Sequence, residues 1–494
     1  MSSSGAKGLD AVVVGSGPNG LAAALVLARA GLSVEVFEGA PTPGGGCRTE
    51  ELTLPGFHHD VCSTIQSMVP LSPFFVELGL ERRGLRLLSP EVAFAHPFDG
   101  GRAASVHGTV AETAATLGAD GGAYAQLMGP LVDATATLVP TVLSSLRSIP
   151  RRPIPMARFA LAGVPSAAHL VRRFSADAQG LFAGVSSHAM MSLDTPLTAA
   201  FGIFLMVTAH AGGWPLVEGG SSGLVDALVS ELEDAGGTVR TGQWIRNMKE
   251  LPASRVTLFD TSPQTLVAVA GERLPAHYVN AVSRFRNGSG VCKVDWALSG
   301  PVPWSALECR RAATIHLGGS FEEVALAEAD VAAGRHAEKP FCIVVQPSVV
   351  DSSRAPTGQA TLWAYCHVPN GSTVDMTSRI EAQIERFAPG FGDLVLARNT
   401  ITAAQSEQHN PNYVGGDING GAGTLRQTIF RPTMRWNPYR TGAAGLYLCS
   451  SSAPPGGGVH GMCGVGAARA ALHDLKHDPL RLDALRSRPS AGPD

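Results

Sequence analysis

The stretch Asp10-Ala-Val-Val-Val-Gly-Ser-Gly-Pro-Asn-Gly20 decides the fold of this chain, together with the residues that continue it to Glu38. Residues 12–14 form an unbroken apolar run, which is typical of a strand buried on both faces of a parallel sheet. Residues 21–30 are rich in alanine and leucine and predict a helix that ends at Gly31. Residues 34–37 predict a second buried strand. The stretch therefore predicts a strand–helix–strand unit of an α/β fold.

The three glycines after the first strand have the spacing of a dinucleotide-binding turn. Gly15 permits a sharp turn, Gly17 permits close approach of the backbone to a pyrophosphate, and Gly20 permits close packing of helix on strand. The N–H groups and the dipole at the helix start attract phosphate oxygens. The predicted contacts in this turn are Gly15, Ser16, Gly17, Pro18, Asn19 and Gly20.

Glu38 ends the second strand, about 20 residues after the glycines. Its carboxylate can accept hydrogen bonds from an adenosine ribose, and it disfavours a 2′-phosphate, so NADP is a poor candidate. The glycines alone would also fit an ordinary turn. Strand, glycines, helix, strand and acid in this order predict a dinucleotide site.

Two later glycine-rich segments also indicate a ligand. Residues 41–49 hold three glycines before Arg48, so the backbone of this loop can approach a ligand and the arginine can pair with a phosphate; an ordinary surface turn is the alternative. Residues 454–461 follow a predicted buried strand at 445–450 and precede a helix of small residues. The positive end of that helix suits an anionic or electron-rich ring, and a plain turn is again the alternative.

Composition limits the classes of function. Of 494 residues, 45% are hydrophobic and 16% are charged, below the usual charged share of about 25%, so we expect large buried sheets and an apolar cavity. The net charge of −3 gives no basic surface for nucleic acid. The eight cysteines form no C-x-x-C pair and the histidines have no metal spacing. We therefore expect reduced thiols, a cytoplasmic setting and no metal site.

The sequence gives little sign of a membrane segment. No apolar leader precedes the first strand, and the longest apolar stretch, residues 197–207, is shorter than the ~20 residues of a spanning helix. We expect a buried helix that lines a cavity there. A surface that dips into a membrane is the alternative, so membrane association and a peripheral membrane contact stay open.

The pattern of the sequence changes twice along the chain. Residues 65–214 have mainly helical patterns. Within residues 289–440, the stretches 293–298 and 362–368 alternate apolar with polar side chains, which predicts a half-exposed antiparallel sheet. We predict a discontinuous Rossmann-like nucleotide-binding domain of residues 9–64, 215–288 and 441–478. The predicted substrate domain is an α+β insertion of residues 65–214 and 289–440 with an antiparallel sheet and a helical subdomain. Residues 479–494 are predicted to be a loose tail.

With these motifs the chain resembles the phytoene desaturase superfamily of two-domain flavoproteins. That superfamily includes carotene ketolases and isomerases, retinol saturase, and proteins named for a pyridine nucleotide-disulfide oxidoreductase domain. The matching stretches are residues 14–38, 44–57, 218–228, 410–421 and 445–464. The resemblance implies a glutathione reductase-type nucleotide fold that holds FAD in an extended form.

The resemblance also implies where FAD would lie. Its pyrophosphate would meet residues 15–20, its ribose Glu38, its adenine Ile245, and its isoalloxazine ring the loop at 457–459. The loop at 44–48 departs from the family's usual Gly-Gly-Arg, because Arg48 is displaced by two positions. The other implied cofactor contacts are Gly39, Gly45, Gly46, Cys47, Arg48, Ser451, Gly457, Gly458 and Val459.

The implied function is that of an FAD-dependent oxidoreductase, a dehydrogenase or desaturase that transfers hydride between flavin and a hydrophobic small molecule, such as an isoprenoid or polyene. A second dinucleotide fingerprint is missing, which argues against a reductase with its own NADPH domain. His460 is the one candidate catalytic residue, as acid, base or orienting group, and a satisfied structural histidine is the alternative. Tyr413 and Asp417 would line the same cleft or stabilise turns.

Three other functions stay open on the sequence. They are an amine-oxidase-like flavin oxidase, a redox-neutral flavin isomerase, and a flavin-binding scaffold without catalysis. The sequence also leaves open the substrate, the electron acceptor and the oligomeric state.

Overall fold

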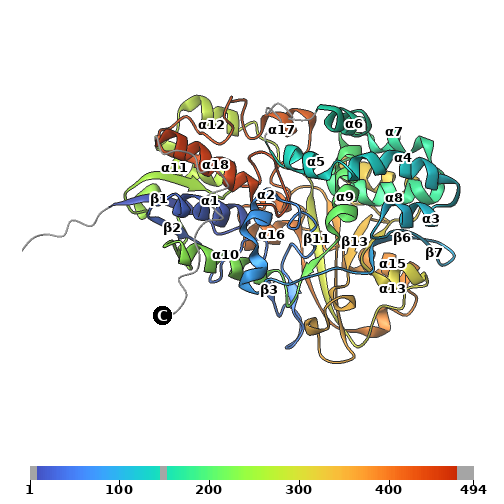
Figure 1. Ribbon diagram of the computed structural model, residues 1–494. Helices are drawn as coiled ribbons and strands as arrows, with labels where there is room; N and C mark the ends of the chain where they lie inside the picture. Colours follow the sequence, from blue (N-terminus) through green and yellow to red (C-terminus); the bar gives the residue numbers. More distant parts are fainter. Residues whose placement is uncertain (1–7, 145–152, 476–494) are drawn as a thin grey trace, which may run out of the picture.

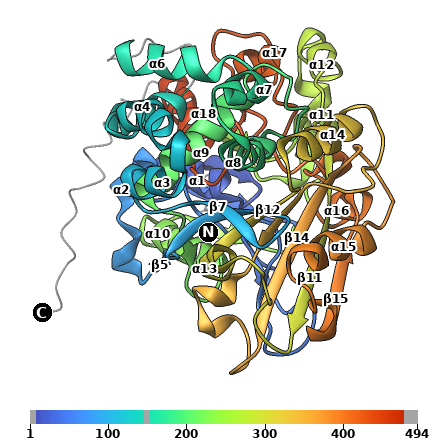
Figure 2. The same cartoon turned by 90° about the vertical axis from the view of Figure 1, so that its right-hand side faces the viewer.

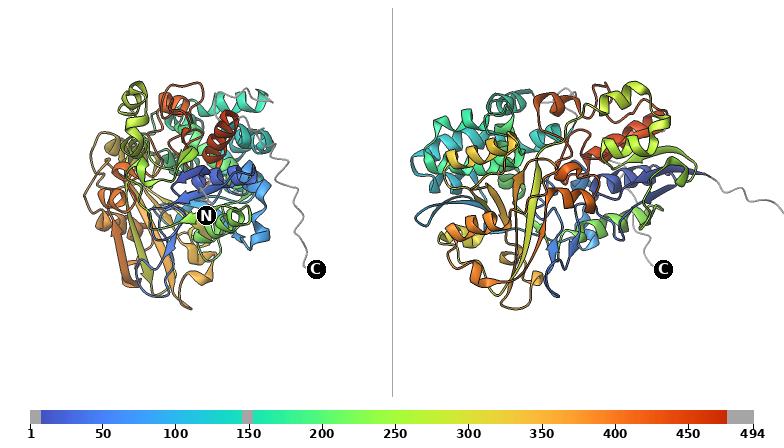
Figure 3. Two further views of the ribbon diagram at one scale, coloured as in Figure 1. Left: turned by 90° about the vertical axis from the view of Figure 1, so that its left-hand side faces the viewer. Right: turned by 180° about the vertical axis from the view of Figure 1, so that it is seen from behind.

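The computed structural model describes residues 8–144 and 153–475, so the predicted tail at 479–494 lies outside the described residues. Figures 1 and 3 show a parallel sheet with its helices at one end of the molecule and a larger sheet at the other. A layer of helices covers one side of the larger sheet. The predicted α/β class with an added antiparallel sheet is therefore confirmed. The exact domain boundaries stay a prediction.

The parallel sheet contains the strand–helix–strand unit that the sequence predicts. Its strand order is β16-β10-β1-β2-β9, and every neighbouring pair is parallel. Ala11 of β1 lies opposite Val34 of β2 on one side and Val256 of β10 on the other, so β1 is central. The strands are β1 (Leu9–Val14), β2 (Val34–Phe37), β9 (Thr238–Arg240), β10 (Ser254–Phe259) and β16 (Leu446–Leu448).

Helix α1 (Pro18–Arg29) lies between α18 (Met462–Asp474) and α10 (Ser222–Asp234), as Figure 1 shows. The backbones of α1 and α18 nearly touch, because a β-carbon built on Gly464 would lie 1.9 Å from the carbonyl oxygen of Asn19. Small side chains in α18 make this approach possible and place its start beside the start of α1. The other helices around this sheet are α2 (Pro73–Leu78), α11 (Pro263–Ala270) and α12 (Ala276–Val282).

The larger sheet has seven strands in the order β15-β11-β14-β13-β12-β6-β7. Neighbours are antiparallel except β12 and β6, which are parallel. Its strands are β6 (Val92–Phe98), β7 (Arg102–Val106), β11 (Gly290–Leu298), β12 (Ala312–Leu317), β13 (Cys342–Val345), β14 (Ala360–Val368) and β15 (Val395–Ile401). Two short pairs join β3 (Thr49–Glu50) to β4 (His59–Asp60), and β5 (Leu87–Leu88) to β8 (Leu216–Val217).

The prediction that this sheet is half exposed is wrong. Every residue of β11 is buried. Its apolar face packs against α15 (Thr377–Phe387) and neighbouring loops. Its other face carries Lys293 and Asp295, which pair with each other inside the protein. The alternation of polar and apolar residues is real, but the polar positions meet a buried charge network and not water.

A layer of helices covers the second face of this sheet within the described residues, and α14 (Phe321–Ala332) also packs there, against β14. Helix α8 packs on α9 and on strands β6, β7 and β12. Figure 2 shows these helices above the sheet, with α13 (Leu307–Arg311) and α15 on the other side. The covering helices are α3 (Val110–Thr116), α4 (Gly121–Val132), α5 (Thr135–Val142), α6 (Pro153–Gly163), α7 (Ala167–Leu170), α8 (Ala176–Ser186) and α9 (Thr198–Gly212). The remaining helices are α16 (Ala403–His409) and α17 (Leu425–Phe430).

Among the described residues, no helix on its own has the length and apolar character to cross a membrane. One pair, Pro153–Gly163 with Ala167–Arg173, meets that criterion together, but its two helices are bent by 94° at the break.

Candidate functional site

The glycine turn brings strand, helix and neighbouring backbone to within contact distance. Gly15 has φ +98°, a conformation that other residues rarely adopt. A β-carbon on Gly20 would lie 2.2 Å from the carbonyl oxygen of Gly15, so only glycine fits there. Helix α1 starts after Gly17 with no side-chain cap. Gly17 is the N-cap residue, and it has no side chain that could accept a hydrogen bond from the first N–H groups of the helix.

Glu38 is held in place at the end of β2. Its Oε2 accepts hydrogen bonds from the backbone N–H and the hydroxyl of Ser16 at 2.9 and 2.6 Å, and its Oε1 accepts from Ala40 N–H at 2.8 Å. Ser16 therefore occupies both lone pairs of Oε2, and Oε1 keeps a second lone pair for a ligand. Trp244 packs over Gly39, where a β-carbon would lie 2.4 Å from the indole ring, and Ile245 follows it at the same end of the site.

The loop at 44–48 packs on the glycine turn. A β-carbon built on Gly45 would lie 3.1 Å from the Cα of Gly17. Arg48 Nε donates to the carbonyl oxygen of Gly45 at 2.9 Å, so the displaced arginine stabilises the loop itself. A β-carbon on Gly46 would lie 2.4 Å from the hydroxyl of Tyr413, which closes the loop from the other side.

The second glycine segment lies at the start of α18. Gly458 has φ +114° and lies close to Met68, whose sulfur would be 2.9 Å from a β-carbon there. A β-carbon on Gly457 would lie 3.1 Å from the carbonyl oxygen of Asn419. Ser451 packs on Gly420 beside this segment. The loop is therefore enclosed by residues from two distant parts of the chain, Met68 and the 419–420 segment.

One cavity of about 580 Å³ joins these segments. Gly17 and Gly458 both line it, although 441 positions separate them in the sequence. Of the predicted contacts, only Gly20 does not line the cavity; it packs behind Asp260 and Gly15. The predicted residues in its lining are Gly15, Ser16, Gly17, Pro18, Asn19, Glu38, Gly39, Gly45, Gly46, Cys47, Arg48, Ile245, Ser451, Gly457, Gly458, Val459 and His460.

The far part of the cavity is apolar. Helix α9 contributes Phe201 and Phe204 to its wall, and Leu197 just before the helix also lines it, which confirms that the 197–207 stretch includes a buried helix lining a cavity. Trp363 and Tyr365 of β14 line it too, and their rings stack 5.8 Å apart at 11°. The cavity therefore has a polar, glycine-rich end and an aromatic end.

His460 is fully buried, and the backbone engages both of its ring nitrogens. Nδ1 accepts from the N–H of Met462 at 3.0 Å, and Nε2 lies 3.2 Å from the carbonyl oxygen of Gly456. Burial lowers the pKa of His460 to about 4, so the ring is neutral at physiological pH. This geometry fits a structural histidine and gives no support to a role as acid or base.

Tyr413 lines the cavity, whereas Asp417 does not. Asp417 accepts hydrogen bonds from the N–H groups of Gly288, Asn419 and Gly421 at 2.7–2.8 Å. Asp417 therefore stabilises the 417–421 turn, which is the second of the two roles that the sequence leaves open, and it does not line the cleft.

Asp260, Trp244, His188 and Trp363 also line the cavity, and the sequence did not indicate them. Asp260 follows β10 and reaches the glycine turn, where its Oδ2 accepts from Gly20 N–H at 2.8 Å. An acid directly after a buried strand was the available signal, because strand ends in parallel sheets meet at one edge. Nothing in the pattern around His188 separates it from other helix-end histidines.

Comparisons with known proteins agree with this architecture. A family profile described as "NAD(P)-binding Rossmann-like domain" matches residues 13–75. A mouse (Mus musculus) protein named pyridine nucleotide-disulfide oxidoreductase domain-containing protein 2 is 28% identical over 95% of this chain and 94% of its own length. A 4,4'-diapolycopen-4-al dehydrogenase of Metabacillus indicus is 30% identical, but over 24% of this chain and 25% of its own.

Solved structures show the same fold at low identity. An oxidoreductase from Methanosarcina mazei matches with a TM-score of 0.62 and 17% identity, over 94% of this chain and 100% of that one. A putrescine oxidase variant matches with a TM-score of 0.60 and 17% identity, over 95% and 99%. These findings agree with a Rossmann-like nucleotide-binding domain joined to a second, mostly antiparallel sheet.

Proposed function

We propose that this protein is an FAD-dependent dehydrogenase or desaturase that transfers hydride between flavin and an apolar small molecule. The observation that carries the proposal is the single cavity that connects the glycine turn with the apolar wall of α9. Its two ends have different chemistry, one suited to a dinucleotide and one to a hydrocarbon. An isoprenoid or polyene is the proposed substrate class.

The residues present fit FAD. Gly15 and Gly17 line the cavity at the turn where a pyrophosphate would lie, and Glu38 presents a fixed carboxylate at the expected ribose position. Among the described residues, the Oδ1 of Asn19 is buried without a hydrogen-bond partner in this same turn, so it can accept one from a ligand. The start of α18 would face the ring.

The bound flavin would supply the hydride acceptor, and the chain would position the substrate and exclude water from the reacting groups. Phe201, Phe204 and Trp363 would exclude water from the apolar part of the cavity and hold the substrate against the ring. His460 would fix the shape of the 456–462 loop through its two backbone contacts and would not move a proton.

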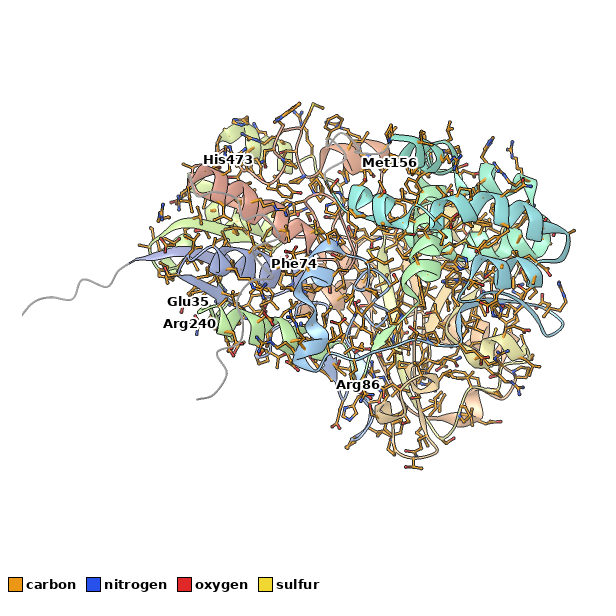
Figure 4. The ribbon with its side chains drawn as sticks, viewed as in Figure 1. Glu35, Phe74, Arg86, Met156, Arg240 and His473 are labelled. Carbon is orange, nitrogen blue, oxygen red and sulfur yellow. The ribbon has the colours of Figure 1, made fainter. Side chains whose placement is uncertain are left out.

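The test compares the FAD affinity of alanine variants of two glutamates, Glu38 just after β2 and Glu35 within it. We expect Glu38→Ala to weaken FAD binding by about tenfold or more, because the ribose loses its acceptor. Glu35→Ala is the matched control, since Glu35 pairs with Arg240 (Figure 4) and neither residue lines the cavity, and we expect a change below about twofold. FAD affinity is measured by flavin fluorescence quenching on protein stripped of cofactor. Protein that stays colourless and takes up no added FAD contradicts the proposal.

Anaerobic mixing then separates the remaining functions. Loss of flavin colour with an isoprenoid or polyene supports the dehydrogenase. Loss of colour with amines only, followed by rapid reoxidation in air, supports an amine-oxidase-like enzyme instead. Isomerised product without net bleaching indicates a redox-neutral isomerase.

A further inference from the structure

Two buried histidines meet at the wall of the cavity. His188 lies in a short 3-10 helix (Ser187–Ala189) after α8, and His316 lies in β12. Their Nε2 atoms are 2.9 Å apart, and their rings cross at 81° with centroids 5.1 Å apart. His188 lines the cavity and is partly exposed to it, whereas His316 is fully buried behind it. The pair therefore connects the cavity surface to the protein interior.

The surroundings of His316 fix its ring. Phe94 and Phe341 lie against it, with centroids 5.1 and 6.1 Å away. The backbone of α8 passes so close that a β-carbon on Gly184 would lie 2.6 Å from the Cβ of His316. Among the described residues, its Nδ1 is buried without a hydrogen-bond partner. His188 is thus the polar neighbour that positions this ring.

The unpartnered Nδ1 decides the direction of the hydrogen bond. If His188 donated, His316 would carry its proton on Nδ1, as a buried N–H without an acceptor. Orphaned buried N–H groups are rare in folded proteins, and burying a donor without an acceptor is costly. His316 Nε2–H therefore donates to His188 Nε2. His188 then carries its own proton on Nδ1.

His188 makes one hydrogen bond through Nε2, with His316, and one through its backbone carbonyl oxygen, with Asn419. Its Nδ1–H therefore has no acceptor among the described residues. That carbonyl oxygen lies 3.5 Å from Asn419 Nδ2, and the backbone of Asn419 contacts Gly457. Asn419 therefore lies between His188 and the loop that would meet the flavin ring. Burial lowers the pKa of His188 to about 3 and that of His316 well below its usual value, so both rings stay neutral.

We propose that the apolar substrate carries a neutral oxygen, as an alcohol or carbonyl group, and that His188 Nδ1–H binds this oxygen. His316 is the positioning residue, because it holds His188 in the donor tautomer. The inference rests on the proposed function for the location of the reactive end, and it narrows the substrate class from a hydrocarbon to an oxygenated isoprenoid-like molecule.

The experiment measures selectivity among matched probes: myrcene as hydrocarbon, geraniol as alcohol, citral as aldehyde and geranylamine as amine. Binding to the purified protein is followed by intrinsic tryptophan fluorescence, since Trp214, Trp244 and Trp363 line the cavity. We expect geraniol and citral to bind about tenfold more tightly than myrcene. His188→Phe should remove this preference and leave myrcene binding within about twofold, and His188→Gln, which keeps an N–H donor, should retain most of it.

His210→Phe is the matched control, because His210 is also a partly buried histidine, paired with the Tyr124 hydroxyl at 2.7 Å, but it does not line the cavity. Its selectivity should equal that of the natural protein. His316→Phe should lower the preference for geraniol without removing the His188 ring.

Equal affinity of the natural protein for myrcene and geraniol overturns the proposal, as does an unchanged preference in His188→Phe. Tightest binding of geranylamine, lost in His188→Phe, overturns the assignment of His188 as a donor. Flavin absorbance is read in the same samples. Protein that binds no FAD but still prefers geraniol contradicts the proposed function and leaves the role of His188 standing.

Discussion

Asp260 places a carboxyl group inside the glycine turn. Its Oδ2 accepts from Gly20 N–H at 2.8 Å and would lie 2.6 Å from a β-carbon on Gly17. Burial raises the pKa of Asp260 to about 7, with the nearby Glu38 carboxylate acting in the same direction and the N–H groups of Gly20 and Gly17 in the opposite one. A charged Asp260 would repel the pyrophosphate of a bound FAD, whereas the protonated form would not.

We therefore expect FAD to bind more weakly as Asp260 loses its proton. From about pH 6 to about pH 8 the dissociation constant should rise about tenfold in the natural protein, because only the protonated fraction binds well. Asp260→Asn keeps an acceptor for Gly20 and should show a flat profile. Equilibrium titration with FAD across this range is the measurement, and parallel profiles for the two proteins contradict the prediction.

The same group predicts the pH dependence of the protein without FAD. A carboxyl whose pKa is raised on folding binds its proton more tightly in the folded state. Its contribution to stability is therefore full below its unfolded pKa near 3.8 and is lost as the pH rises towards 7. Asp260→Asn should accordingly gain stability relative to the natural protein at neutral pH, measured by thermal unfolding. The only sign of this contact in the sequence is an acid directly after a buried strand, since 240 positions separate Asp260 from Gly20.

At the scale of elements, Asp60 of β4 joins three segments around one buried carboxylate. It accepts from Arg354 at 2.6 Å, from Ser221 N–H at 2.8 Å and from Thr49 Oγ1 at 2.8 Å. Both Asp60 and Arg354 have no exposed surface. Burial alone would raise the pKa of Asp60, but the Arg354 guanidinium and these hydrogen bonds hold it below the usual value.

Arg354→Met should destabilise the protein by about 3–5 kcal/mol, because it leaves the Asp60 carboxylate buried without its cation. Arg335→Met is the matched control, since Arg335 pairs with Asp330 at an exposed position, and its cost should stay below about 1 kcal/mol. Urea unfolding followed by circular dichroism measures both. Equal costs would show that the buried pair contributes no more than a surface one. In the natural protein its contribution is lost as the pH falls below 3.8.

The elements show what the sequence could predict and where it failed. Local patterns found β1, α1, β2 and the cavity helix α9, because burial on one or both faces leaves a periodic signature. The exposure of β11 was predicted wrongly. Lys293 and Asp295 alternate with apolar residues as on a solvent-exposed face of a sheet, but they pair with each other inside the protein. His188, just after α8, and Trp363 of β14 line the cavity because of how these elements pack in the folded protein. A local sequence pattern cannot predict that packing.

At the scale of the whole molecule, the cavity extends from the glycine turn to two helices whose other faces lie on the protein surface. Helices α6 and α17 lie at the top of the molecule in Figures 1 and 2, and Phe159 and Thr428 from these helices line the cavity. The outward faces of the two helices carry exposed apolar side chains. Ile154 is 67% exposed, Leu161 80% and Leu425 51%.

The last prediction concerns the peripheral membrane contact that the sequence leaves open. Exposed apolar residues beside the exposed cations Arg158 and Arg426 form a surface that suits an anionic lipid bilayer, from which an apolar substrate could enter the cavity. We expect the protein to float with vesicles of phosphatidylcholine and phosphatidylglycerol, and the double variant Ile154→Glu/Leu161→Glu to lower binding at least about tenfold. Leu326→Glu is the control, because Leu326 is 64% exposed on α14 but does not line the cavity. Flotation that is absent, or that both variants reduce equally, contradicts a contact through α6.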